Sequence, residues 1–383
     1  MGTRHSPGPA IRILFVVDAI QPPLTGVGRL ALALLRALAA QGTTLAAVDW
    51  RPNPLVEETG VPLHILPQRL PFGTTALFHL TLARRIAAAR IPHDVLFDPS
   101  GYPDAFGPAA RSVLLVHDLS MLRKGTYRPG KRRWFQAFYP RALRRAAALA
   151  CVSASTRTEL LRAVPRLAPD RVHVVPGCLD PDLQGALASA AEARVGGGDG
   201  VLFVGTLEVR KNLLTLLEAY AQARVRGLRR PLVLAGRPGF GAEAILARAG
   251  APDLREHVRV LGAVDEATLH RLYGASFALV LPSREEGFGL PILEGFAAGL
   301  PVLTGTTSAM PEVAGDAALL ADTGDAAALR DALLRLEQDA GLRAGLVARG
   351  RARLAHFAAA ASARALLYIL LGVAKQDARA ALS

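Results

Sequence analysis

Short apolar runs alternate with amphipathic stretches along the first half of the chain. Residues 11–17 form an almost continuous apolar run, which is typical of a strand buried on both faces. A loop rich in proline and glycine follows, and the spacing then predicts a helix over about 29–40. Further strands are predicted at 44–48, 95–97 and 113–116, with helical stretches such as 77–89 between them. This alternation favours a doubly wound sheet of parallel strands.

The same alternation restarts after a glycine-rich run at Val195–Gly200, the most linker-like part of the chain. Strands are predicted at 201–204, 231–235, 259–261, 278–281 and 302–304, and three more helices after Asp325. The sequence therefore predicts an α/β fold of two similar halves. Because ligands bind outside the carboxyl ends of parallel strands, we expect one cleft between the two halves.

Composition agrees with a folded two-domain protein. The chain has 383 residues, of which 51% are hydrophobic and 20% charged, and this excludes wholesale disorder. Its two cysteines have neither a disulfide nor a metal-ligand spacing, which fits a reducing cytosol. We expect neither a secretory signal, since the first apolar run ends at Asp18, nor a membrane span, since Ser362 and Arg364 interrupt the apolar run 357–374.

The formal net charge of +13 suggests an anionic partner without choosing among nucleic acid, lipid headgroup and phosphorylated substrate. Only four of the 45 basic residues are lysines, so a lysine inside a motif is an unusual choice in this chain.

The segment Glu286–Glu294, Glu-Gly-Phe-Gly-Leu-Pro-Ile-Leu-Glu, follows a predicted strand and leads into a predicted helix. Gly287 and Gly289 would let the backbone approach a phosphate, and the helix start offers unpaired N–H groups to an anion. A carboxylate beside a phosphate is unfavourable unless it binds neutral hydroxyls. We therefore assign Glu294 to a ribose and Glu286 to a sugar, with helix capping as the structural alternative.

A second motif, Arg210-Lys211-Asn212, also follows a predicted strand. Asn212 is a suitable N-cap for a helix over 213–220, which places two cations at a helix start that cations normally avoid. A bound diphosphate would explain them, and a solvated pair of cations is the alternative.

Together these motifs resemble the family 4 (group 1) retaining glycosyltransferases, whose fold is the two-domain GT-B arrangement. The resemblance includes Ser308–Asp316, Gly26 and Gly28 near the start, and Val116-His117-Asp118. It implies two Rossmann-like domains, 1–194 and 195–356, with a last helix, about 357–375, that crosses back to the first. One departure lies at Pro176–Asp180, where relatives usually have Asn-Gly, and it puts acceptor choice in doubt.

The resemblance further implies transfer of a hexosyl group from a nucleotide-sugar donor to a glycan or lipid-linked acceptor, with no cofactor and no tightly bound metal. Arg210 and Lys211 would hold the diphosphate, and Glu294 the ribose. His117 would lie close to the reacting sugar. The remaining assignments are Glu286, Gly287, Phe288, Gly289 and Leu290 around the donor, and Gly26 and Gly28 in the cleft loop. GDP-mannose is the first donor expectation, followed by UDP- and dTDP-sugars.

Three other interpretations stay open. Gly26–Ala31 fits the G-x-G-x-x-A pattern of NAD-type enzymes, although residues 18–25 separate it from the strand. Asp180-Pro-Asp182 resembles a metal-binding D-x-D, which we interpret as turn chemistry. The segment 121–150 carries nine cations and no acid, with aromatic residues among them. It predicts a nucleic-acid surface, an anionic membrane surface or a solvated face, and we favour the inner face of the plasma membrane for a cytoplasmic enzyme, without nucleic acid.

Overall fold

The structure is a computed structural model, and it describes residues 11–66, 75–101, 111–123, 125–126, 129–192 and 198–380. The first half of the molecule is built on a sheet of seven parallel strands in the order β3-β2-β1-β4-β5-β6-β7. Its strands are β1 (Arg12–Val16), β2 (Thr44–Asp49), β3 (Leu63–Ile65), β4 (Val95–Asp98), β5 (Ser112–Val116), β6 (Ala148–Cys151) and β7 (Val172–Val174). The central strands are buried on both faces, as their continuous apolar sequences predict.

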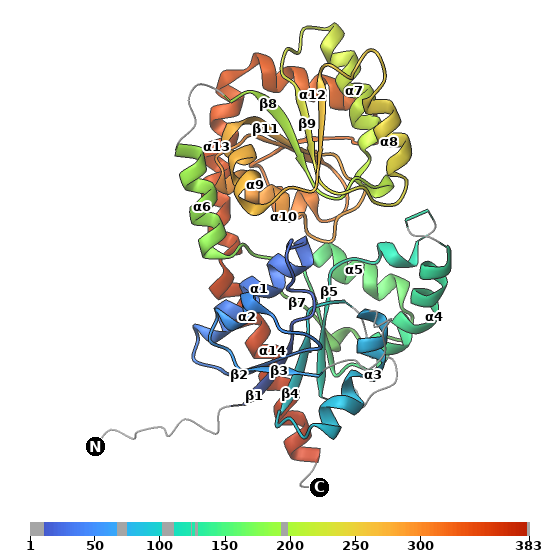
Figure 1. The fold of residues 1–383 in the computed structure, drawn as a ribbon, viewed down its shortest axis with the longest axis vertical. Helices are drawn as coiled ribbons and strands as arrows, with labels where there is room; N and C mark the ends of the chain where they lie inside the picture. Colours follow the sequence, from blue (N-terminus) through green and yellow to red (C-terminus); the bar gives the residue numbers. More distant parts are fainter. Residues whose placement is uncertain are drawn as a thin grey trace, which may run out of the picture.

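The second half is built on six parallel strands in the order β10-β9-β8-β11-β12-β13. Its strands are β8 (Gly200–Val204), β9 (Leu232–Ala235), β10 (Val258–Gly262), β11 (Ser276–Leu281), β12 (Val302–Gly305) and β13 (Leu319–Ala321). The two sheets confirm the predicted fold class of two Rossmann-like units (Figure 1).

Helices cover both faces of each sheet (Figure 1). Those of the first half are α1 (Gly26–Ala39), α2 (Pro54–Glu57), α3 (Thr75–Ala88), α4 (Pro129–Arg145), α5 (Ala154–Ala163) and α6 (Pro181–Glu192). Those that follow are α7 (Leu213–Val225), α8 (Ala242–Ala249), α9 (Glu266–Ala275), α10 (Leu290–Ala297), α11 (Met310–Ala314), α12 (Ala326–Gln338), α13 (Ala340–Arg353) and α14 (Ala359–Ala380). The short 3-10 turns used below are η1 (Ser120–Leu122) and η3 (Val209–Lys211).

Every strand expected from the sequence is present, and the structure adds four that pattern did not predict: β3, β6, β7 and β13. Each has only three or four residues, which is too short for a periodic signal. In β6 the sequence Ala-Leu-Ala-Cys suits a helix equally well, and only its pairing with β5 and β7 makes it a strand.

The last helix, α14, crosses back to the first half, as expected. It packs against α1 and against β4, β5 and β6, beside the N-terminal sheet in Figure 1. Leu366 and Leu370 are fully buried in this contact, whereas Tyr368 points to solvent. Within the described residues, no helix combines the length and the apolar character that a bilayer-spanning segment needs.

The chain passes between the halves next to α6, which packs against α9 and α10 of the second half. The predicted hinge at Val195–Gly200 falls partly on residues 193–197, which lie outside the described residues, so the division at 194/195 stays a prediction. At the other crossing Leu179 pairs with Ala358, which joins the two connecting segments side by side.

Candidate active site

The two motifs of the second half meet because β8 and β11 are neighbours in the parallel sheet, so their carboxyl ends lie together. The Lys211 Nζ atom donates to Glu286 Oε1 at 2.6 Å, although the two residues are 75 positions apart. Both side chains are at least nine-tenths buried. The structure therefore joins one residue from each motif in a single buried ion pair.

Other carboxylates lie close to the two basic residues, Arg210 and Lys211. Arg210 donates through Nε to Glu208 Oε1 at 2.5 Å, and its NH1 atom lies 3.5 Å from Glu286 Oε2 and 4.0 Å from Asp118 Oδ2. Burial would raise the pKa of Glu286, but Lys211 and Arg210 lower it below its ordinary value. Glu286 is thus a carboxylate that neutralises the charges of Lys211 and Arg210.

Two serines that the sequence analysis left without a role hold Glu286 in place. Ser283 donates through Oγ to Glu286 Oε1 at 2.5 Å. Ser308 accepts from the Glu286 N–H at 3.0 Å and donates to the Glu286 carbonyl. Ser308 begins the third family motif, so its motif was visible in the sequence, whereas nothing in the pattern distinguished Ser283.

The expectation that Asn212 caps α7 through its side chain is wrong. Asn212 does precede the helix, but its backbone is left-handed (φ 57°) and its side chain makes no capping bond. Its Nδ2 donates to the Thr323 carbonyl at 2.5 Å, and its Oδ1 accepts from Thr215 and Arg284. Asn212 therefore links η3, the turn that carries Arg210 and Lys211, to neighbouring loops. This role depends on tertiary contacts.

The start of α10 has the predicted form of a glycine loop leading into a helix. Gly289 precedes the helix with φ 95°, a conformation that favours glycine, and Pro291 lies in the first turn. Within the helix, the buried Glu294 accepts from the Tyr273 hydroxyl at 2.5 Å. A methyl group on Gly26 would lie 3.8 Å from Leu290, so the first turn of α10 faces the start of α1.

Loop 286–289 contacts the first half directly. Ser153 and Thr156 both donate side-chain hydroxyls to the Gly287 carbonyl, at 2.6 and 3.0 Å. A Cβ on Gly287 would overlap the carbonyl oxygen of His117, so only glycine permits this approach. The loop is therefore held between the two halves next to His117.

His117 follows β5 and is held as a neutral ring. Its Nε2 lies 2.7 Å from the Pro99 carbonyl, which can only accept, so Nε2 carries the proton. Burial lowers the pKa of His117 below its ordinary value, against the effect of that bond. The ring is thus an Nε2–H tautomer whose Nδ1 atom is a hydrogen-bond acceptor.

The other predicted site residues occupy packing positions. The Phe288 ring lies against Gly177, where a Cβ would come within 2.6 Å of it, and stacks edge-on with Phe357 at 5.4 Å. The segment Pro176–Asp180, which departs from the family pattern, thus packs against loop 286–289. Gly28, in the first turn of α1, is buried close to the Ala19 carbonyl.

The alternative motifs have structural partners. Arg36 bridges Asp180 and Asp182 at 3.0 and 3.1 Å, and Asp180 Oδ1 accepts from the Asp182 N–H, which makes the D-x-D a turn held by an arginine. Gly26 begins α1 ten positions after the end of β1, not in a tight turn. Within the described ranges, no group of three or more His, Cys, Asp or Glu side chains is arranged so that it could hold a metal ion.

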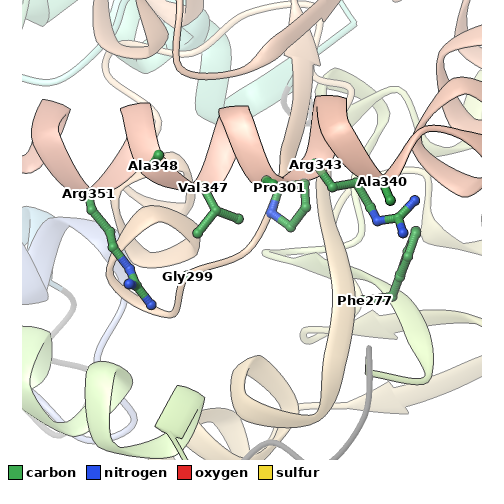
Figure 2. Close-up of a pocket in the computed structure, with 9 residues that line it drawn as sticks. Phe277, Gly299, Pro301, Ala340, Arg343, Val347, Ala348 and Arg351 are labelled. Carbon is green, nitrogen blue, oxygen red and sulfur yellow. The ribbon is translucent and has the colours of Figure 1, made fainter.

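A shallow groove of about 460 Å³ runs along α13, lined by Phe277, Gly299, Pro301, Arg343 and Arg351 among others (Figure 2). Phe277 and Pro301 mark the amino ends of β11 and β12. The groove therefore lies at the opposite edge of the sheet from Lys211 and Glu286, and it plays no part in this site.

Two parallel-sheet domains with this loop arrangement define the GT-B class. Comparison with protein families agrees: residues 24–183 match the model described as Glycosyltransferase Family 4, and residues 198–339 match Glycosyl transferases group 1. Together the two models span most of the chain. The chain belongs to the family 4, group 1 glycosyltransferases, and it is an enzyme of that family.

Individual relatives extend the similarity over the whole length. The chain is 29% identical to O-antigen chain mannosyltransferase B of Escherichia coli over 369 residues, which cover 91% of this chain and 96% of the relative. HepE of Anabaena, in complex with UDP and glucose, has a TM-score of 0.68 at 17% identity and covers 97% of this chain and 100% of its own. Sucrose-phosphate synthase of Thermosynechococcus elongatus has a TM-score of 0.73 at 21% identity. The match covers 95% of this chain and 100% of the synthase chain.

Proposed function

We propose that this glycosyltransferase moves a mannosyl group from a nucleotide-sugar donor, GDP-mannose first, to a glycan or lipid-linked acceptor, with retention of configuration and without a metal. The mannosyl assignment is supported by similarity along almost the whole chain to a mannosyltransferase of O-antigen chains. A nucleotide-sugar donor is also supported by a similar fold, HepE, that was crystallised with UDP and glucose.

The observation that carries the proposal is the convergence of Arg210, Lys211 and the start of α10 at one edge of the sheet, opposite His117. Two cations and the N–H groups of Gly287, Phe288 and Gly289 would bind the donor diphosphate. In the free protein Glu286 neutralises the cations. When the diphosphate takes over the cations, Glu286 would turn to the hydroxyls of the donor sugar.

The remaining contacts follow the family resemblance. Glu294 would accept from the ribose hydroxyls, with Leu290 against the donor and Gly26 and Gly28 beside the acceptor. His117, neutral with Nδ1 as acceptor, would bind a hydroxyl of the transferred sugar. Arg210 and Lys211 would stabilise the negative charge that develops on the leaving diphosphate, the role that a metal ion has in other transferases.

The test is a panel of GDP, UDP and dTDP measured by thermal shift and calorimetry, repeated with Lys211→Ala and Glu294→Ala. Each variant removes a charge-assisted contact worth roughly 1.5–3 kcal/mol, so we expect binding of the preferred nucleotide to weaken about ten- to a hundredfold. Lys375→Ala, which removes an exposed lysine on α14, is the control and should bind as the wild type.

Circular dichroism must show both variants folded. Unchanged nucleotide affinity in both would contradict the site assignment. Sugar transfer from GDP-mannose in excess EDTA, with anomeric analysis of the product, tests the metal and the stereochemistry. Loss of activity in EDTA or an inverted product would refute that part of the proposal.

We also propose that α4 docks this enzyme on an anionic membrane surface where a lipid-linked acceptor is presented. Its exposed Arg133, Arg141 and Arg144 recur at helical spacing, and the helix contains no acidic residue. The aromatic part of the sequence interpretation was wrong for two residues: Phe135 and Tyr139 are buried in the core and are unavailable for stacking on bases or inserting into lipid.

A further inference from the structure

His79, on α3, is a buried histidine that the proposed reaction does not use. Its side chain has no exposed surface, and its two ring nitrogens lie against two carboxylates from different loops. Nε2 is 3.1 Å from Asp18 Oδ2, in the loop after β1, and Nδ1 is 3.2 Å from Asp98 Oδ2, at the end of β4. A carboxylate oxygen within 3.2 Å of each ring nitrogen favours the imidazolium form of His79, which carries a proton on both nitrogens.

The surrounding charges support this protonation state. Burial by itself would lower the pKa of His79, but Asp98 and Asp18 raise it to about 10. At neutral pH one buried cation therefore balances two buried carboxylates. Asp18 has a second oxygen, Oδ1, that is buried without a hydrogen-bond partner among the described residues, so the contact of Oδ2 with His79 holds this carboxyl group in place.

Asp98 links His79 to the turn formed by residues 98–100. Its Oδ1 atom accepts from the Ser100 N–H at 2.8 Å and from the Ser100 hydroxyl at 2.6 Å, while Oδ2 faces His79. The Ser100 hydroxyl also lies 3.3 Å from His79 Nε2. Between Asp98 and Ser100 lies Pro99, whose carbonyl accepts from His117 Nε2 at 2.7 Å.

We propose that His79 is a positioning residue for glycosyl transfer: held between Asp18 and Asp98, it fixes the Asp98–Ser100 turn and so the Pro99 carbonyl that orients His117. The inference rests on the role of His117 in the proposed function. Without the His79 ring, the Asp98 carboxylate would lose its partner at Oδ2 and would be free to rotate. It would then release Ser100, and the carbonyl would no longer hold the proton of His117 on Nε2.

The ring of His117 reports this coupling directly. In ¹⁵N-histidine-labelled full-length protein, with His117→Asn used to assign the signal, wild-type His117 should show a protonated Nε2 and an unprotonated Nδ1. In His79→Gln we expect a mixture of the two tautomers. His93→Gln is the matched control, because that half-buried ring contacts the nearby Ile91 carbonyl at 2.9 Å, and it should leave the His117 signal unchanged.

Kinetics separate positioning from general loss of structure. Residues that orient a functional histidine through a second group typically change activity by roughly ten- to a hundredfold. We expect such a decrease in kcat for His79→Gln, with the KM for the donor changing by less than about threefold because the diphosphate contacts lie in the other half.

If His79→Gln does not fold, Asp18→Asn decides, because it removes one partner and keeps the side-chain shape. It should shift the His117 tautomer partly. An unchanged His117 signal in the folded variant overturns the inference, whatever the activity. If instead the tautomer shifts while His117→Asn keeps full kcat, the coupling holds and the proposed role of His117 fails, so the two failures are distinguishable.

Discussion

Asp49 is a buried carboxyl group at the end of β2, close to the first loop of the chain. Its Oδ2 atom accepts from Gln21 at 3.1 Å and from Asn53 at 3.4 Å, and its Oδ1 from the Trp50 N–H at 2.7 Å. Burial raises the pKa of Asp49 to about 6, to which the charge of Asp18 adds, while the bonds from Trp50 and Asn53 act in the opposite direction.

The sign of the resulting pH dependence follows from this raised pKa. The folded state holds a proton on Asp49 up to about pH 6, whereas the unfolded chain loses it near pH 4, so stability falls as the pH rises through this window. The loss is at most about 3 kcal/mol at pH 7.5. We expect Asp49→Asn to be more stable than the wild type at pH 7.5 and nearly equal to it at pH 4.

Urea unfolding at pH 4, 6 and 7.5 measures this effect. Asp316→Asn, at a side chain that is 85% exposed, serves as the control and should follow the wild-type pH curve. If the difference in the free energy of unfolding between the wild type and Asp49→Asn is the same at pH 4 and 7.5, the pKa of Asp49 is not raised in the folded state.

Among the elements, α4 combines two opposite faces. Phe135, Tyr139 and Leu143 point into the core of the first half, and Arg133 and Arg141 point to solvent. The buried face is enough to hold α4 in the fold without lipid. The exposed arginines can therefore be replaced without disturbing the core. A surface of this kind binds anionic lipid electrostatically and is sensitive to salt.

Reversing the charges of that face should weaken the proposed docking on an anionic membrane. Each arginine near an anionic surface contributes about 1 kcal/mol, so Arg133→Glu with Arg141→Glu should weaken binding to phosphatidylglycerol vesicles at least tenfold. Arg255→Glu with Arg259→Glu makes the same change in net charge on exposed positions of the second half. Equal vesicle sedimentation of the two double variants would refute docking through α4.

The two halves of the molecule contact each other directly at several points. Glu312 of α11 accepts from the Ala154 and Ser155 N–H groups at 2.8 and 3.0 Å, which caps α5 from the opposite half. Arg29 pairs with Glu266 at 2.5 Å on another side of the interface. Together with the Gly287 carbonyl and its hydroxyl partners, these contacts determine how closely loop 286–289 approaches His117.

A methyl group at Gly287 should force the halves apart. Its Cβ would overlap the His117 carbonyl and lie 3.1 Å from the Asp118 Cβ, so one backbone must move. A displacement of about 1 Å at a reacting centre costs roughly a hundredfold in rate. We expect Gly287→Ala to lower kcat by at least tenfold and to increase the radius of gyration in X-ray scattering.

Gly185→Ala is the matched control, because a Cβ at that helical position meets no atom within 4 Å. It should keep the wild-type scattering curve and turnover. If Gly287→Ala also keeps both, the close approach of the two halves is not required for activity.

The sequence by itself determined the two-sheet fold and the sheet edge at which the motifs 210–212 and 286–294 lie. Continuous apolar runs predict buried parallel strands, and the residues that follow such strands lie at one edge of the sheet, so Arg210, Lys211 and Glu286 could be grouped in advance. The glycine loop that leads into a helix at Glu286–Glu294 was likewise predicted, because the backbone preferences of glycine and proline are local.

Only the tertiary structure decided the partners of these groups. The pairing of Lys211 with Glu286, the use of Asn212 as a link instead of a cap, and the enclosure of His79 by Asp18 and Asp98 join residues that are distant in sequence. Local pattern carries no information about such contacts, since each depends on which strands are neighbours and how closely two domains approach. Short strands such as β6 were missed for the same reason, because pairing rather than periodicity makes them strands.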